Sequence, residues 1–146
     1  MRRWLALAWL LILAPAMGCT SLDPLGRKDA LSDTQRRYTD MVRWGDLERA
    51  EQFVDPEHLE EFKRLAGGFE NLHITDHEIG EIEYEDRTAY VTVTYKGYSR
   101  AHLVEHTTRE RQEWVRSGIN NVWLVRPQLA VMVAELQGLP REPAPE

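Results

Sequence analysis

The chain has 146 residues, and its 18 Lys and Arg residues stand against 24 Asp and Glu residues, for a formal net charge of −6. This length is typical of a single domain, and it is enough to bury a core without a metal ion or a disulfide. The acidic balance argues against nucleic acid as a partner, because phosphate binding depends on clustered Lys and Arg. A single cysteine also excludes any disulfide within the chain.

The first eighteen residues have the features of a secretory signal peptide. Two arginines follow Met1, Trp4–Ala14 is an unbroken apolar run of eleven residues, and small residues precede Cys19. A helix that crosses a membrane needs about 20 apolar residues, so this run is too short to span one. We therefore expect residues 1–18 to be removed.

The stretch Ala16-Met17-Gly18-Cys19 resembles the lipobox of bacterial lipoproteins. This resemblance implies that the Cys19 thiol carries a lipid, that the signal peptide is cut before it, and that the new amino terminus is acylated. Several acyl chains together anchor a protein stably to a membrane. Because Thr20 rather than Asp follows the cysteine, the resemblance also implies sorting to the outer membrane, facing the periplasm. The alternative is an ordinary signal peptide that is cut elsewhere.

A tether is expected between the lipid and the folded domain. Residues 19–31 include Pro24 and Gly26 and show no apolar periodicity. The domain is expected to begin at Ser32, because Ser32-Asp33-Thr34-Gln35 fits a capping box at the start of a helix. Gly45 should end this helix.

Two further short helices are predicted before the chain changes to strands. The first covers Leu47–Val54 after a cap at Asp46. The second begins at Asp55-Pro56, since Asp is a favoured cap and Pro is favoured at the first helical position. Gly67-Gly68 should stop this second helix.

Beyond Gly68 the apolar period changes from 3.6 to 2, which predicts strands. The first strand covers Leu72–Tyr84, and Glu85-Asp86-Arg87 is expected to be a hairpin turn. The second covers Thr88–Tyr95, with four residues on one face: Ala89, Val91, Val93 and Tyr95. Gly97 indicates a bulge or bend.

A third strand is predicted over Ser99–Arg116. Its middle, Thr107–Glu113, is highly polar and is expected to be solvated on at least one face. A turn over Ser117–Asn121 leads into a fourth strand, Val122–Val125. The chain then continues as a short helix or edge strand over Gln128–Leu136, and residues 137–146 form a polar, Pro-rich tail.

The third and fourth strands bring two tryptophans together. If their turn is centred between Gly118 and Ile119, then Trp114 faces Trp123 directly, a cross-strand pair of a kind that contributes about 0.2–1 kcal/mol. Val104, together with Val122 or Val125, is available to surround Trp114, so we expect Trp114 in the core.

Helices followed by antiparallel strands predict an α+β domain over residues 32–136. The element order, with a bend at Gly97, resembles the nuclear transport factor 2-like and cystatin-like folds, which implies N-terminal helices packed on a bent antiparallel sheet. The segments Tyr38–Asp46 and Asp55–Glu57 also resemble those of small bacterial envelope lipoproteins. That second resemblance implies no activity.

The segment His102-Leu103-Val104-Glu105-His106 matches the inverted zincin motif H-x-x-E-H. Zinc ligation by this motif requires a helix that places the histidines one turn apart. A helix here would have no apolar stripe to bury, whereas a strand would turn Glu105 away from both histidines. We therefore predict solvated strand histidines and no metal site.

The other polar residues also give no catalytic motif. His73 and His77 would lie about 13 Å apart on an unbroken strand, too far for a shared metal. A group of carboxylates is expected at a solvated hairpin end: Glu81, Glu83, Glu85 and Asp86. The chain contains no G-x-S-x-G elbow and no phosphate-binding glycine loop, so no cofactor is predicted.

The aromatic residues either pack the core or line a pocket, and Trp44, at a helix end, is the candidate ligand-binding residue. The sequence favours a lipid-anchored envelope protein that works by binding an envelope protein or a small apolar ligand, or that serves as an assembly subunit. The alternative is a small bent-sheet enzyme with an acid/base pair inside the cone. A closed, apolar-filled cone with an exposed aromatic patch would favour protein binding, and a pocket that holds a buried His or carboxylate with a strongly perturbed pKa would favour the enzyme.

Overall fold

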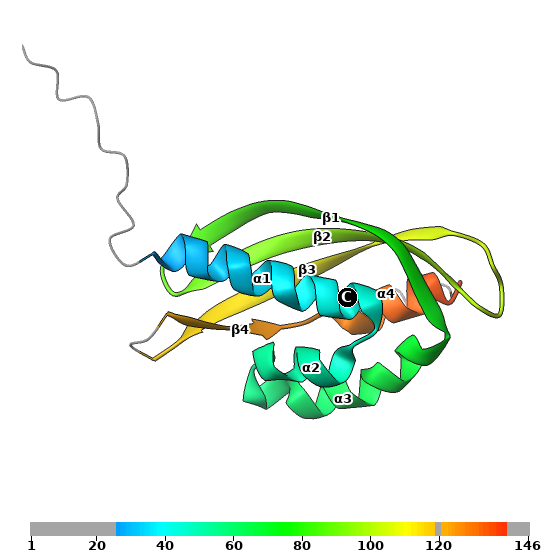
Figure 1. Cartoon of the computed structure of the whole chain (residues 1–146), viewed down its shortest axis with the longest axis horizontal. Helices are drawn as coiled ribbons and strands as arrows, with labels where there is room; N and C mark the ends of the chain where they lie inside the picture. Colours follow the sequence, from blue (N-terminus) through cyan, green and yellow to red (C-terminus); the bar gives the residue numbers. More distant parts are fainter. Residues whose placement is uncertain (1–25, 119–120, 140–146) are drawn as a thin grey trace, which may run out of the picture.

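The computed structural model describes residues 26–118 and 121–139, which form a curved sheet with helices along its inner side (Figure 1). The sheet is antiparallel, in the order β1-β2-β3-β4. Its strands are β1 (Leu72–Glu85), β2 (Thr88–Ser99), β3 (His106–Ser117) and β4 (Val122–Arg126). The predicted turn between β1 and β2 is confirmed at Asp86 and Arg87.

The helices precede the sheet, except for one that follows it. They are α1 (Arg27–Trp44), α2 (Leu47–Ala50), η1 (Glu51–Phe53), η2 (Pro56–His58), α3 (Leu59–Ala66), η3 (Gly67–Asn71) and α4 (Leu129–Leu136). Gly45 ends α1 in the left-handed conformation that glycine adopts without strain, with φ at 71°. Asp55 caps η2 by accepting a hydrogen bond from the Glu57 backbone, and Pro56 opens it, as predicted.

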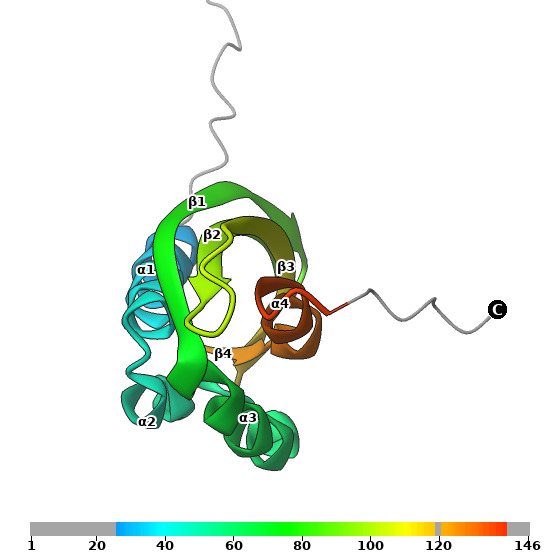
Figure 2. The same cartoon turned by 90° about the vertical axis from the view of Figure 1, so that its right-hand side faces the viewer.

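In the end-on view of Figure 2, the four strands curve into an incomplete ring. Helix α1 contacts both edge strands, β1 and β4, and α4 packs against β2 and β3. At β1, Arg43 Nη2 donates to Thr75 O at 3.1 Å. At β4, Asp55 N donates to Val125 O at 2.8 Å. The structure confirms the predicted α+β architecture, with helices packed on a bent antiparallel sheet.

The bend of the sheet is produced where β1 slips in register against β2. One slip lies between Ile74 and Asp76, opposite Gly97, and the other between Ile79 and Ile82. A side chain at Gly97 would place its Cβ only 2.6 Å from His73 O, so the close approach of the two strands requires glycine here. The predicted irregularity at Gly97 is therefore confirmed, with the extra residue on β1.

The start of α1 corrects the prediction. The helix begins at Arg27 after Gly26, with no side-chain cap, and the predicted capping box from Ser32 to Gln35 lies inside it. Leu31 is fully buried, so packing of this side chain extends the helix upstream of Ser32. Residues 27–31, expected in the tether, thus belong to α1. Residues 1–25 and 140–146, which include the predicted signal peptide, Cys19 and the end of the predicted tail, lie outside the described residues.

The third predicted strand is also wrong over its first part. Residues 100–105 form a turn and loop, and β3 starts only at His106. The backbone N–H groups of His102 and Leu103 both donate to Ser99 O, and Leu103 adopts a φ of 45°. This reversal is what allows β3 to pair antiparallel with β2. The strand interpretation is therefore incorrect for residues 102–105 and correct only for His106.

The two tryptophans share the inner face but do not face each other directly. Trp114 pairs with Val125, and Trp123 pairs with Arg116, so the register differs from the prediction. Trp114 is 0% exposed, which confirms its place in the core. Val104 does not surround it, because that side chain lies in the loop and is exposed.

The last predicted segment is a helix, α4, and not an edge strand. Its buried side chains are Leu129, Met132, Val133 and Leu136. None of the helices within residues 26–118 and 121–139 is long and apolar enough to cross a membrane.

Candidate functional site

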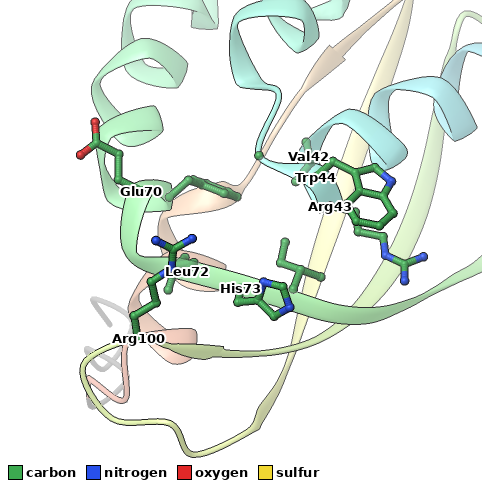
Figure 3. A pocket seen from close by; sticks show the side chains of 10 residues that line it. Val42, Arg43, Trp44, Glu70, Leu72, His73 and Arg100 are labelled. Atoms are coloured by element: carbon green, nitrogen blue, oxygen red, sulfur yellow. The ribbon is translucent and has the colours of Figure 1, made fainter.

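A pocket of about 240 Å³ opens at the C-terminal end of α1, and we call it the Trp44 pocket (Figure 3). Its walls come from the end of α1, from η3 and the start of β1, and from the residue after β2. Buried apolar side chains form its floor: Val42, Phe69, Leu72 and Ile74. Its other lining residues are Arg43, Trp44, Gly45, Glu70, His73 and Arg100.

Trp44 is placed at the pocket because α1 stops immediately after it. Gly45 turns the chain away in the left-handed conformation, so no further helical turn covers the indole, which is 74% exposed. The Arg43 Cζ atom lies 5.1 Å from the centroid of the Trp44 ring. With its Nη2 bonded to Thr75 O, Arg43 is held between Trp44 and β1.

Two charged side chains of opposite sign border the other side of the pocket. The backbone N–H of Arg100 donates to Asn71 O at 2.8 Å, which fixes the start of the side chain. Among the described residues, neither the Arg100 guanidinium nor the Glu70 carboxylate has a hydrogen bond or ion pair. His73 lies between them and Trp44, and its ring packs against Tyr98 at 5.1 Å.

A second polar feature lies inside the curve of the sheet, where β3 turns alternate side chains inward. Thr108, Glu110 and Gln112 are at most 2% exposed, whereas Arg109 and Arg111 on the outer face are exposed. Solvation of one face of this polar strand was predicted and is confirmed. Burial of its other face was missed.

These inward side chains form one hydrogen-bonded cluster. Glu110 Oε2 accepts from Gln112 Nε2 at 2.9 Å and from the Tyr95 hydroxyl at 3.2 Å. Glu110 Oε1 accepts from the backbone N–H of Gln128 at 3.3 Å. Gln112 Oε1 in turn accepts from Gln35 of α1 at 3.3 Å, which joins the strand to the helix.

Burial raises the pKa of Glu110 from its ordinary 4.5 to about 7, although the hydrogen bonds from Gln112, Tyr95 and Gln128 act in the opposite direction. Burial and the nearby Glu110 carboxylate raise the pKa of both Tyr38 and Tyr95. The Tyr38 hydroxyl has no hydrogen-bond partner among the described residues. Glu110 itself is 0% exposed, so no solvent reaches this carboxylate directly.

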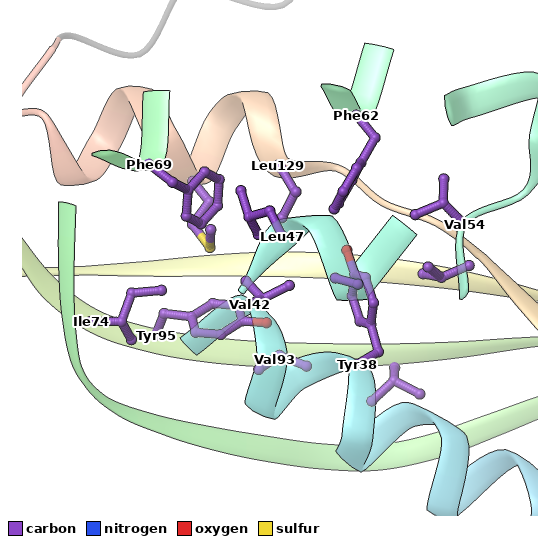
Figure 4. Packing of buried hydrophobic residues seen from close by; sticks show 14 of the residues in the cluster. Tyr38, Val42, Leu47, Val54, Phe62, Phe69, Ile74, Val93, Tyr95 and Leu129 are labelled. Carbon is purple, nitrogen blue, oxygen red and sulfur yellow. The ribbon is translucent and has the colours of Figure 1, made fainter. Parts of the chain in front are cut away.

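Apolar side chains pack around this cluster and fill the cone (Figure 4). Tyr38 contacts Trp114 edge to face, with ring centroids 5.7 Å apart, and Phe62 at 6.5 Å. Leu129 of α4 lies in the same packed layer. The interior is therefore a core with a polar centre, and the Trp44 pocket lies outside it.

The candidate metal-binding residues are not brought together. His102 lies in the loop before β3 and His106 begins that strand, so the motif has no helix to arrange it. Within the part of the chain that the structure describes, no group of three or more metal-ligating side chains occurs. His77 remains on β1, 3.9 Å from Asp40, while His73 borders the Trp44 pocket.

Sequence reasoning found Trp44 but missed Arg100, Glu70 and the buried Glu110. The pocket residues come from three separate segments, so no spacing in the sequence links them. For Glu110, a signal did exist: Gln35 and Thr39 flank Tyr38 on the apolar face of α1, which indicates that this helix packs against a polar partner.

Comparison with known proteins gives a fold likeness only. No family model matches the chain, and no curated protein matches it. The solution structure of a SEC-C motif-containing protein from Rhodopseudomonas palustris is similar, with a TM-score of 0.52 and 12% identity over 63% of this chain and 71% of that one. At this identity the likeness shows a shared fold and nothing about activity.

A second solved structure is similar at a lower level. It is described as a SnoaL-like polyketide cyclase from Mesorhizobium loti, and it gives a TM-score of 0.42 and 11% identity over 65% of this chain and 97% of that one. We base no functional argument on a likeness of this size.

Proposed function

We propose that this chain is a lipid-anchored protein of the outer membrane, held through Cys19 and facing the periplasm, that works by binding at the Trp44 pocket. The observation that supports binding is the contrast between a filled interior and an exposed tryptophan beside a concave apolar floor. Exposed aromatic side chains at concave sites are typical of binding surfaces. The partner is an envelope protein or a small ligand.

The exposed indole offers a substantial binding free energy. An aromatic side chain buries about 150–250 Å² in total, and Trp44 leaves 74% of its surface in water. At about 25 cal/mol per Å², covering that surface would contribute about 3–5 kcal/mol. Arg43 already stacks on one part of the ring, so a ligand has a prepared aromatic wall.

The anchor is tested by replacing its thiol. Cys19→Ser should leave the unprocessed precursor and abolish incorporation of labelled palmitate, because the thiol is the proposed acylation site. Gel migration and palmitate labelling in growing cells measure both effects. Equal labelling of the variant and the natural sequence would contradict the anchor.

Binding is tested with a photo-reactive phenylalanine analogue at position 44, which keeps an aromatic ring at the pocket. Position 103 is a matched control, because Leu103 is also 74% exposed but lies outside the Trp44 pocket. After irradiation of intact cells, we expect a specific adduct from position 44 that position 103 does not give, identified by mass spectrometry. Equal adducts from both positions, or none from position 44, would contradict the proposed binding site.

The acid/base enzyme remains a second candidate because one observation favours it. Glu110 is a buried carboxyl with a pKa near neutrality, hydrogen-bonded to a tyrosine. Against it, the carboxyl is sealed within the core. A Glu110→Gln variant that keeps the position-44 adduct would support binding as the function and a structural role for Glu110.

A further inference from the structure

Resting on the proposed function, we infer a ligand class for the Trp44 pocket: an aromatic ring that carries a single carboxylate. The apolar floor of the pocket and Trp44 favour an aromatic ring. A volume of about 240 Å³ is smaller than the roughly 300–1,000 Å³ of sites for drug-sized ligands, so the pocket holds one ring-sized group. A planar ring packs best against the flat indole.

We infer the carboxylate group of the ligand from Arg100. Its guanidinium has no partner among the described residues, although the backbone N–H bonded to Asn71 fixes where the side chain starts. A guanidinium binds a carboxylate through two parallel hydrogen bonds, which are among the stronger polar contacts in proteins. Arg100 is therefore a cation available for a ligand.

The charge balance of the pocket favours a monoanion. Arg43 and Arg100 supply two positive charges and Glu70 supplies one negative charge. The lining thus carries one net positive charge, which matches a carboxylate. A phosphate carries up to two negative charges and would meet Glu70 on the same side of the pocket.

The positions of these side chains also determine the orientation of the ligand in the pocket. Arg100 and Glu70 lie on the side of the pocket away from Trp44, with His73 between (Figure 3). A carboxylate at Arg100 leaves the attached ring beside His73 and directed toward the indole of Trp44. Such a group is presented either by a free aromatic acid or by a peptide whose last residue is aromatic.

The test uses the emission of Trp44 in the mature protein. From Cys19 onward the tryptophans are Trp44, Trp114 and Trp123, and the last two are at most 3% exposed, so an added ligand changes the emission of Trp44 alone. The probes are 3-phenylpropanoate, its uncharged amide, phenyl phosphate and acetyl-Ala-Phe. Calorimetric titration measures the same affinities in variants that lack the fluorophore.

We expect the acid to bind about tenfold or more tightly than its amide, because a charge-assisted hydrogen bond is lost with the amide. Arg100→Ala should remove this preference, whereas Arg109→Ala should retain it, since Arg109 is an exposed arginine on the outer face of the sheet. Trp44→Ala should weaken both probes. Tighter binding of the dipeptide than of the free acid would assign the peptide source, and the reverse would assign the free acid.

Other results overturn the inference and separate it from the proposed function. If acid and amide bind with equal affinity and both lose binding in Trp44→Ala, the inferred preference for a carboxylate is wrong but the Trp44 pocket is still the binding site. Tighter binding of phenyl phosphate than of 3-phenylpropanoate would overturn the inferred preference for a monoanion. If no probe binds but the position-44 adduct forms in cells, the ligand class is wrong and the binding function remains. If the adduct is also absent, both fail.

Discussion

Replacing Trp114 with alanine should lower the free energy of unfolding by about 3–5 kcal/mol, which is a large part of the roughly 5–15 kcal/mol total of a natural domain. The indole is 0% exposed and packs edge to face on Tyr38. Its Nε1 donates to Gln112 Oε1 at 3.1 Å, so the substitution also removes a buried hydrogen bond. Chemical denaturation followed by circular dichroism measures the change.

Trp44→Ala is the matched control for this experiment. Trp44 is 74% exposed, so its replacement should change the free energy of unfolding by about 0.5 kcal/mol or less, as at other surface positions. Near-native stability of Trp114→Ala would contradict the inward orientation of β3. A large loss in Trp44→Ala would instead show that this indole supports the fold.

Glu110 should make the protein less stable as the pH rises from 4.5 to 7. The buried carboxyl has its pKa raised from 4.5 to about 7, so between these values the unfolded chain releases the proton that the folded protein keeps. The stability contributed by the neutral carboxyl is complete below pH 4.5 and lost above pH 7. At about 1.4 kcal/mol per pKa unit, the loss is about 2–4 kcal/mol.

Glu110→Gln isolates this effect, because the amide does not titrate. We expect the natural protein to lose about 2–4 kcal/mol more than the variant between pH 4.5 and pH 8. Urea denaturation at several pH values measures the two slopes. Comparing slopes is preferable to comparing one absolute stability, because Gln has a single acceptor oxygen and cannot accept hydrogen bonds at both the Oε1 and the Oε2 position. Parallel slopes would contradict a neutral buried Glu110.

Asp55 does not interfere within this range of pH. Burial alone would raise the pKa of Asp55, but the hydrogen bond from Arg126, 2.8 Å from Asp55 Oδ2, and that from the Glu57 backbone hold it below its ordinary 3.8. Its contribution to stability is therefore complete above pH 3.8 and is lost as the pH falls further.

Local signals predicted the elements whose ends depend on single residues. Gly45 and Asp55-Pro56 marked helix boundaries correctly, because a left-handed glycine and a capped proline act within one turn of the chain. The alternation along β2 identified its buried face, since Val91, Val93 and Tyr95 face one core. These features depend on neighbours in the sequence.

The errors arose where distant packing decides the conformation. The turn after Ser99 contains no Gly or Pro, and its left-handed residue is Leu103, so no local signal identified residues 100–105 as a turn and loop. Both faces of β3 are polar, which left the buried face undetermined until Gln35 of α1 is placed against Gln112. Likewise, Arg100 and Trp44 line one pocket although they are far apart in the sequence.

The position of α1 has a consequence for association between copies of the chain. An edge strand presents unpaired backbone groups that can add a strand from another molecule, and such pairing begins aggregation. Here α1 lies against both edge strands. Arg43 also donates a hydrogen bond to Thr75 O of β1, and the backbone N–H of Asp55 donates to Val125 O of β4. Loss of α1 would uncover β1 and remove the helix from β4, although Asp55, which lies outside the helix, would still bond to Val125 O. If copies are anchored side by side on one membrane, as proposed above, α1 would keep the sheet edges of neighbouring copies apart.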